Sequence, residues 1–255
     1  MILDWVTNAI ASAKSKPCII GMSGANGIGK TTICESLLVA LGKNNLKGAS
    51  ISIDDFYLTR NEQIQLSSKF ANNRFLQHRG YPGTHDIDLG LEIIQKLKNK
   101  NPSKVRVPTY DKSAFDGCGD RFPEAKWKTV ETPLDFILWE GWMLGFQPIT
   151  ESEIKDVHLK QINQLLFAYE RWNALLDSLI ILKPEKMEYV IDWRTQAEQQ
   201  RRNSGRGAMT EIQTIEFSRS FLFALELYSE KMCENPPCLE SIQFIVNKDR
   251  LLKSK

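Results

Sequence analysis

The sequence predicts an α/β fold in which a mostly parallel sheet is flanked by helices. Short apolar runs alternate with segments whose apolar residues recur at helical spacing. A glycine-rich loop joins the first apolar run to the helix that follows it. The chain has 255 residues, of which 42% are apolar and 25% are charged. These values fit one globular domain spanning residues 1–255.

The charge balance and the cysteine content exclude several classes of protein. Lys and Arg total 33 and Asp and Glu total 31, so the net charge of +2 argues against a nucleic-acid coat protein. No apolar run is long enough to cross a bilayer, and residues 1–16 do not resemble a secretory signal. The five scattered cysteines form no CxxC motif, so we expect a reducing, cytoplasmic compartment and no zinc site.

Periodicity gives the expected order of elements. Helices are expected over 2–14, 30–41, 87–97, 158–176, 187–202 and 210–232, and strands over 18–22, 49–53, 105–110, 136–139, 179–182 and 243–246. The polar segments 57–83 and 111–128 are expected to be irregular. Pro108 places the strand at 105–110 near a sheet edge. The apolar residues of 210–232 are expected to pack in the core, not to bind a cofactor.

A phosphate-binding loop is the strongest motif. Residues 24–31, GANGIGKT, match GxxxxGK[ST] between a strand and a helix, a context that a chance glycine-rich turn would lack. The backbone N–H groups and the helix N-terminus would hold phosphates, with Lys30 on the β- and γ-phosphates and Thr31 on Mg²⁺. The predicted ATP-binding residues are Gly24, Ala25, Asn26, Gly27, Ile28, Gly29, Lys30, Thr31 and Thr32.

The rest of the sequence narrows the class of nucleotide-binding protein. Asn247-Lys248-Asp249 is followed by Arg250, so the NKxD guanine motif of GTPases is absent, and we interpret this stretch as the end of a terminal strand. An LSGG-type signature is also absent, which disfavours a transporter ATPase. A GxGxxG motif that begins at Gly27 would need glycine at position 32, where the chain has Thr32. This absence disfavours a dinucleotide-binding fold. A small-molecule kinase fits best.

Acidic residues follow two predicted strands, at the edge where parallel sheets bind ligands. Asp54 is placed to orient or deprotonate an attacking hydroxyl or to hold Mg²⁺ through water, and Asp55 is a weaker candidate. The alternative for Asp54 is a turn or helix cap. Glu140 ends an apolar strand, as in a Walker B motif with Glu in place of Asp, and would support Mg²⁺. The alternative for Glu140 is an ion pair at a sheet edge.

Basic residues gather in two further segments. Residues 78–121 hold His78, His85 and several cations interleaved with aspartates, which is typical of a solvated loop or of a pocket for an anionic acceptor. Arg201, Arg202 and Arg206 lie on or after a late helix, next to Gly205 and Gly207. They suit a mobile lid that closes over ATP, or else a basic surface turn or a nucleic-acid contact.

These motifs together resemble the glycerate 3-kinase family of plants and cyanobacteria and related fungal ATP-dependent kinases, which are similar to uridine kinase and pantothenate kinase. The resemblance covers residues 17–232. The residues that carry it are GANGIGKT (24–31), SIDDFYLT (52–59), RGYPGTHD (79–86), PTYDKSAFDGCGDR (108–121), LWEGWMLGF (138–146) and DWRTQAEQQRR (192–202). The lid sequence GRGAMTEIQ departs from the family pattern, and residues 147–157 are short and polar.

The resemblance implies transfer of the γ-phosphoryl group of ATP to D-glycerate, with Mg²⁺ as cofactor and a small anionic acceptor. It implies Lys30, Asp54 and Arg202 as catalytic residues and Thr31 at the metal. With the two acids that end strands, the predicted metal-binding residues are Thr31, Asp54 and Glu140. The acceptor segment would span about 57–128 and the lid about 192–210. The implied acceptor-binding residues are Arg79, His85, Asp86, Tyr110, Lys112 and Arg121. A kinase of another small hydroxylated metabolite and a non-catalytic ATP-binding regulatory protein remain as alternatives.

Overall fold

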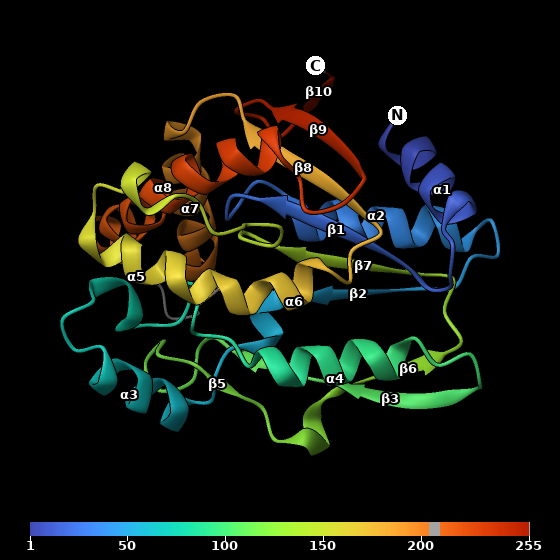
Figure 1. Ribbon diagram of the computed structural model, residues 1–255, viewed down its shortest axis with the longest axis horizontal. Helices are drawn as coiled ribbons and strands as arrows, with labels where there is room; N and C mark the ends of the chain where they lie inside the picture. Colours follow the sequence, from blue (N-terminus) through green and yellow to red (C-terminus); the bar gives the residue numbers. More distant parts are fainter. Residues whose placement is uncertain (204–209, 255) are drawn as a thin grey trace.

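A six-stranded sheet forms the centre of the computed structural model, which describes residues 1–203 and 210–254. The strand order is β10-β9-β8-β1-β7-β2, and every neighbouring pair is parallel except β9 and β10 (Figure 1). The predicted α/β fold is thus confirmed. The strands are β1 (Cys18–Gly24), β2 (Gly48–Ser52), β7 (Phe136–Gly141), β8 (Ser178–Pro184), β9 (Glu240–Val246) and β10 (Leu252–Ser254).

Helices cover both faces of this sheet because its central strands are apolar on both sides. The β1 and β7 strands are buried along their whole length. The helix α2 (Lys30–Gly42) lies on one face, where the sulfur atoms of Cys34 and Met22 are 3.8 Å apart. On the opposite face, Trp139 of β7 packs against Trp172 of α6 (Glu170–Asn173), with ring centroids 5.2 Å apart. The helix α1 (Ile2–Ser12) buries Val6, among others, beside α2 and β1.

Two small antiparallel ladders lie outside the main sheet. The predicted strand at 105–110 is instead β3 (Ser103–Val107), which pairs with β6 (Lys128–Thr132) and not with the central strands. The expected loop 111–128 contains β5 (Asp120–Arg121), paired with β4 (Tyr110–Asp111). The expectation of an irregular 111–128 segment is therefore corrected. These strands are short and half-exposed, so they carry no apolar run that periodicity could detect.

The expectation that 57–83 is irregular is also wrong, because it contains the helix α3 (Arg60–Lys69). This helix buries none of its residues, so apolar spacing gives no sign of it. Its N-terminus carries a capping box, in which the Thr59 hydroxyl accepts from the Glu62 N–H while the Glu62 carboxylate accepts from the Thr59 N–H. The T-x-x-E pattern was the available signal.

The remaining helices follow the expected order; the helix over 87–97 has the expected bounds, and the bounds of the others differ. The helices are α4 (Ile87–Leu97), α5 (Val157–Leu166), α7 (Glu188–Asn203) and α8 (Glu211–Glu234). The expected helix 158–176 is broken into α5, a 3₁₀ turn and α6. Phe221, Leu225 and Tyr228 of α8 are buried as predicted, whereas Ile212 is 71% exposed.

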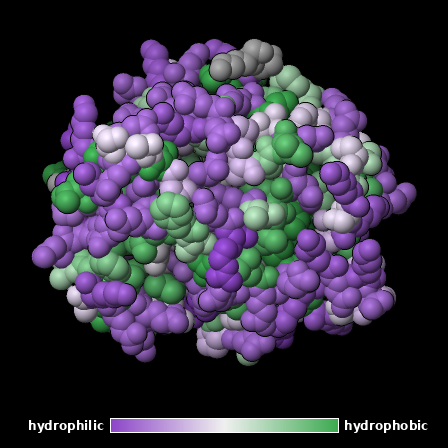
Figure 2. Space-filling model, in the orientation of Figure 1, coloured by the Kyte–Doolittle hydropathy of each residue, from purple (hydrophilic) through white to green (hydrophobic). Residues whose placement is uncertain are grey.

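The surface agrees with this layering. In the orientation of Figure 1, Figure 2 shows a mainly hydrophilic rim with hydrophobic residues gathered in patches towards the middle of the face. Within residues 1–203 and 210–254, no helix is both long enough and apolar enough to cross a membrane.

The contact between α4 and α6 predicts a stability difference between two glycine variants. A Cβ at Gly90 would lie 2.6 Å from the rigid Trp172 ring, whereas a Cβ at the exposed Gly42 meets nothing within 4 Å. We expect Gly90→Ala to lower the free energy of unfolding by about 1–2 kcal/mol through overpacking. Gly42→Ala is the matched control, expected to raise it by about 0.4–1 kcal/mol. Urea unfolding measures both, and equal effects would contradict the packing argument.

Candidate active site

The loop between β1 and α2 has the geometry that phosphate binding requires. Gly27 and Gly29 adopt φ values of 83° and 107°, in the left-handed region that glycine tolerates. A Cβ on Gly27 would lie 3.0 Å from the Cβ of Trp193 in α7, so a side chain there would be both strained and crowded. A backbone of this kind can present N–H groups to a phosphate at the N-terminus of a helix, here α2.

Lys30 is buried at the start of α2 and points back into the loop. Its Nζ donates to the carbonyl oxygens of Gly24 at 2.8 Å and Ala25 at 3.2 Å, and lies 3.9 Å from Glu140 Oε2. Burial lowers the pKa of Lys30, and the Glu140 and Asp54 carboxylates oppose that shift. The ammonium is therefore held among carbonyls and carboxylates, where an anionic phosphate would be strongly attracted.

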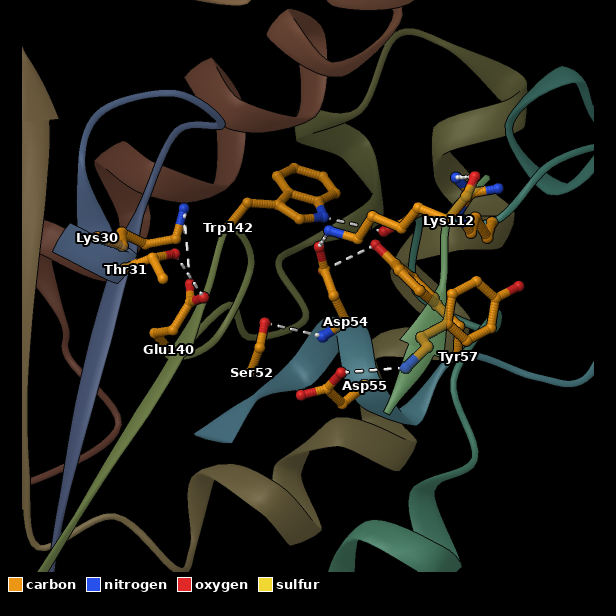
Figure 3. Close-up of polar contacts among 12 residues, drawn as sticks. Lys30, Thr31, Ser52, Asp54, Asp55, Tyr57, Lys112, Glu140 and Trp142 are labelled. Carbon is orange, nitrogen blue, oxygen red and sulfur yellow. Dashed lines mark hydrogen bonds and ion pairs between the residues drawn. The ribbon is translucent and has the colours of Figure 1, made fainter. Parts of the chain in front are cut away.

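Glu140 lies beside the loop because β7 is the neighbour of β1. The Thr31 hydroxyl donates to Glu140 Oε1 at 3.2 Å (Figure 3). Hydroxyl and carboxylate oxygens are the ligands that Mg²⁺ prefers, so these two side chains fit a magnesium ion that also binds phosphates and water. Across residues 1–203 and 210–254, no group of three or more His, Cys, Asp or Glu could form an all-protein metal cage.

Asp54 lies in a 3₁₀ turn directly after β2, and its side chain is held on both oxygens. Oδ1 accepts from the Tyr57 hydroxyl at 2.9 Å, and Oδ2 pairs with Lys112 Nζ at 2.5 Å (Figure 3). Burial alone would raise the pKa of Asp54, but the Lys112 ammonium outweighs it, so the pKa is lowered. Asp54 makes no described hydrogen bond to Thr31 or Glu140.

Asp55 has a different role from its neighbour. Its Oδ1 accepts from the backbone N–H of Tyr110 at 3.2 Å, and its Oδ2 lies 3.4 Å from Lys128 Nζ. Burial raises the pKa of Asp55 despite these partners. Asp55 therefore anchors the acceptor segment to the sheet edge.

Three of the predicted acceptor-binding residues build the loop that carries Lys112. Arg79 donates to the carbonyl oxygens of Lys112, Gly117 and Cys118. Arg121 donates to the Tyr57 carbonyl at 2.9 Å and lies 3.2 Å from Asp86 Oδ2. Asp86 also caps α4, since its Oδ1 accepts from the Leu89 N–H. In this structure their charges are used within the protein.

His85 and Tyr110 lie against Tyr57, a residue that the search for charged groups missed. The Tyr57 ring is 4.4 Å from His85 and 5.4 Å from Tyr110. The Tyr169 hydroxyl is 2.7 Å from His85 Nδ1 and accepts from the Gly83 N–H. Tyr57 occurs in the SIDDFYLT stretch, but nothing in its spacing pointed to the contact with Asp54.

The predicted lid is described only in part. Arg202 is exposed near the end of α7, where its Nη1 donates to Gln199 at 3.0 Å. Arg206, Gly205 and Gly207 lie outside the described residues, as does the side chain of Arg201. Within α7, Arg194 lines a small cavity together with Ala25 and Asn26 of the phosphate loop. Sequence reasoning missed Arg194, although it lies in the DWRTQAEQQRR stretch.

The residues 247–250 form a turn between β9 and β10, which corrects their interpretation as the end of a terminal strand. Asn247 Oδ1 accepts from the backbone N–H groups of Asp249 and Leu251. Arg250 Nε then donates to the Gly27 carbonyl at 2.8 Å. The C-terminal hairpin thus braces the phosphate loop, a contact that no sequence motif signalled.

The buried His85 predicts a pH-dependent stability. Burial lowers its pKa from 6.5 to about 3, although the nearby Asp54 carboxylate opposes that shift. The unfolded chain binds a proton below about pH 6.5 that folded His85 does not, so stability is lost as pH falls, by up to about 1.4 kcal/mol per pH unit. Urea unfolding should show a shallower decline for His85→Gln, because the variant lacks this imidazole. Parallel declines would contradict the prediction.

Known proteins share both the sequence pattern and the fold. The chain is 38% identical over 240 residues to the chloroplastic D-glycerate 3-kinase of Arabidopsis thaliana, covering 89% of this chain but 53% of that protein. It is 33% identical over 245 residues to the uncharacterized kinase mug58 of Schizosaccharomyces pombe, covering 90% and 88%. The chain therefore spans about half the length of the plant relative.

Two solved structures are similar to this chain over nearly its whole length. The D-glycerate 3-kinase of Cryptococcus neoformans var. grubii superposes with a TM-score of 0.85 at 29% identity, covering 98% of this chain and 94% of that chain. The YGR205w protein superposes with a TM-score of 0.81 at 30% identity, covering 99% and 92%. The chain has the fold and the phosphate-binding loop of a P-loop kinase. The phosphoribulokinase/uridine kinase family pattern matches residues 19–157, and the chain belongs to that family.

Proposed function

We propose that this protein transfers the γ-phosphoryl group of ATP to a hydroxyl of D-glycerate, giving 3-phosphoglycerate and ADP. The observation that carries the proposal is the pairing of Asp54 with Lys112 at the edge of the sheet that bears the phosphate loop. An acceptor with a carboxylate a few bonds from its reacting hydroxyl has a partner for each of these charges. The plant and Cryptococcus relatives named as D-glycerate 3-kinases support this choice of acceptor.

The phosphate loop binds the nucleotide in this proposal. Residues 24–32 surround the β- and γ-phosphates with backbone N–H groups, and Lys30 exchanges its carbonyl partners for phosphate oxygens. When bound, Mg²⁺ would be held by Thr31 and Glu140 and would neutralise part of the phosphate charge. Asp54 would not ligate Mg²⁺ directly while Lys112 and Tyr57 occupy its oxygens.

Asp54 orients the acceptor hydroxyl and takes its proton. Its lowered pKa keeps the carboxylate ionised at neutral pH, as a hydrogen-bond acceptor must be. Such a weak base suffices because the transition state of phosphoryl transfer is loose, so positioning and charge supply most of the rate enhancement. Tyr57 fixes the carboxylate plane through its hydrogen bond to Oδ1.

The acceptor lies between β2 and the 57–128 segment. Lys112 binds its carboxylate, while Tyr110 and His85 flank the site around Tyr57. Arg79, Asp86 and Arg121 support the proposal indirectly, since they fix the loop that presents Lys112. Residues 192–210 form the lid, with Arg202 as the predicted arginine that stabilises the transferred phosphoryl group.

We extend the proposal to the number of domains in the chain and to the cellular compartment in which it acts. We infer one P-loop kinase domain over residues 1–255 that acts on a small anionic acceptor without nucleic acid or membrane. Cys18, Cys34, Cys118 and Cys238 have free thiols, which supports a reducing, cytoplasm-like compartment.

A panel of acceptors tests the proposed substrate. Purified protein with Mg·ATP should release ADP rapidly with D-glycerate and much more slowly with uridine, pantothenate or glycerol. Lys30→Ala should lower kcat by at least about 10²-fold, because it removes a preorganised cation from the transferred phosphate. Lys43→Ala, an exposed lysine just after α2, is the matched control and should retain full activity.

Two outcomes would reject the proposal. Phosphorylation of another hydroxylated metabolite with no reaction on D-glycerate would assign a different acceptor to this kinase. Equal background ATP consumption by the wild type and Lys30→Ala across the panel would indicate a regulatory ATP-binding protein instead.

A further inference from the structure

Both oxygens of the predicted base already have a hydrogen-bond donor when no acceptor is bound. Lys112 Nζ is on Asp54 Oδ2 and the Tyr57 hydroxyl is on Oδ1. Any water or hydroxyl that used Oδ2 would have to displace the ammonium or share the oxygen with it. The ion pair therefore competes directly with the chemistry that we assign to Asp54.

The two partners of Asp54 differ in their freedom to move. The Tyr57 side chain is buried, with its ring packed on His85 and Tyr110. The Lys112 side chain is 49% exposed, at the end of a flexible four-carbon stem. The Lys112 backbone carbonyl, in contrast, is held by Arg79. The ammonium can therefore leave Oδ2 while the loop that carries it stays in place.

We propose that Lys112 guards Asp54 against water and releases it only to an acceptor that bears a carboxylate close to the reacting hydroxyl. The acceptor carboxylate takes over the ammonium, and the hydroxyl then occupies Oδ2. A neutral polyol offers no such anion, so it leaves the guard in place. The inference rests on the proposed phosphoryl transfer from ATP, but it does not depend on D-glycerate being the acceptor.

The reaction that the guard suppresses is ATP hydrolysis. A water oxygen forms a bond to the γ-phosphorus, the bond from that phosphorus to the β,γ-bridging oxygen breaks, and ADP leaves with that electron pair. The water proton goes to Asp54 Oδ2. In productive transfer the acceptor hydroxyl replaces water, and the bonds and the proton move in the same way.

Charge-removing variants separate guarding from simple acceptor binding. Lys112→Met removes the ammonium and keeps an apolar side chain of similar length. Lys16→Met is the matched control, because Lys16 is 59% exposed and pairs with Asp135 at 2.5 Å outside the candidate site. Lys112→Arg restores a cation. ADP release is measured with Mg·ATP alone, with D-glycerate and with glycerol, and thermal unfolding verifies that each variant is folded.

The guard predicts opposite changes in two rates. Lys112→Met should raise acceptor-independent ATP hydrolysis by about tenfold or more, because water then reaches Asp54 Oδ2 and a positioned base contributes at least that much to proton transfer. It should lower kcat/KM for D-glycerate by about 10- to 100-fold, through the loss of a charged hydrogen bond to the acceptor. Lys16→Met should leave hydrolysis unchanged, and Lys112→Arg should suppress it again.

Two results would overturn the inference. Hydrolysis by Lys112→Met that stays at or below the wild-type rate would reduce Lys112 to an acceptor-binding residue. Fast hydrolysis that persists in the double variant Lys112→Met, Asp54→Asn would show that the guarded group is not Asp54. If D-glycerate proves inactive with the wild type, the hydrolysis measurements still decide the question, so failure of the guard and failure of the proposed acceptor are distinguishable.

Discussion

The parallel register of three adjacent strands is the constraint on which the site depends. Glu140 of β7 pairs with Met22 of β1 on one side and with Ser52 of β2 on the other. Parallel strands end at the same edge of a sheet. Met22, Glu140 and Ser52 lie in one row across the three strands, and the phosphate loop and Asp54 each follow this row within two residues. A slip of one residue in β7 would turn Glu140 to the opposite face, where Trp139 packs against Trp172.

Long-range hydrogen bonds fasten the catalytic edge to peripheral segments. Arg250, from the turn after β9, bonds to the carbonyl of Gly27 in the phosphate loop. Asp55 bonds to the backbone of Tyr110, and Arg121 bonds to the carbonyl of Tyr57. The segments that they join are 55 to 223 positions apart in sequence. Arg79 and Arg121 of the acceptor segment therefore help to position the Lys112 ammonium and the turn that carries Asp54.

The sequence predicted those parts whose signals are local. A phosphate loop needs glycines and a lysine in a contiguous stretch, and a buried parallel strand shows as an apolar run, so β1, β7 and Lys30 were all accessible. The exposed helix α3 buries nothing and escaped the apolar pattern. The contacts of Tyr57 and Arg250 depend on partners brought together by the fold, and residue type alone does not identify them.

Two arginines of the acceptor segment bind groups of the protein itself, so they do not bind a ligand in this arrangement. Arg79 and Arg121 have their guanidinium groups committed to carbonyls and to Asp86, and rigid bidentate donors suit that task. Lys112 is instead a point charge on a flexible stem, with one ionic partner at 2.5 Å. An acceptor site requires a charged side chain that can exchange its ionic partner for the acceptor, as Lys112 can exchange Asp54. The arginines therefore make the lysine selective, because a fixed loop limits where the exchanged ammonium can go, and hence which anions can draw it away from Asp54.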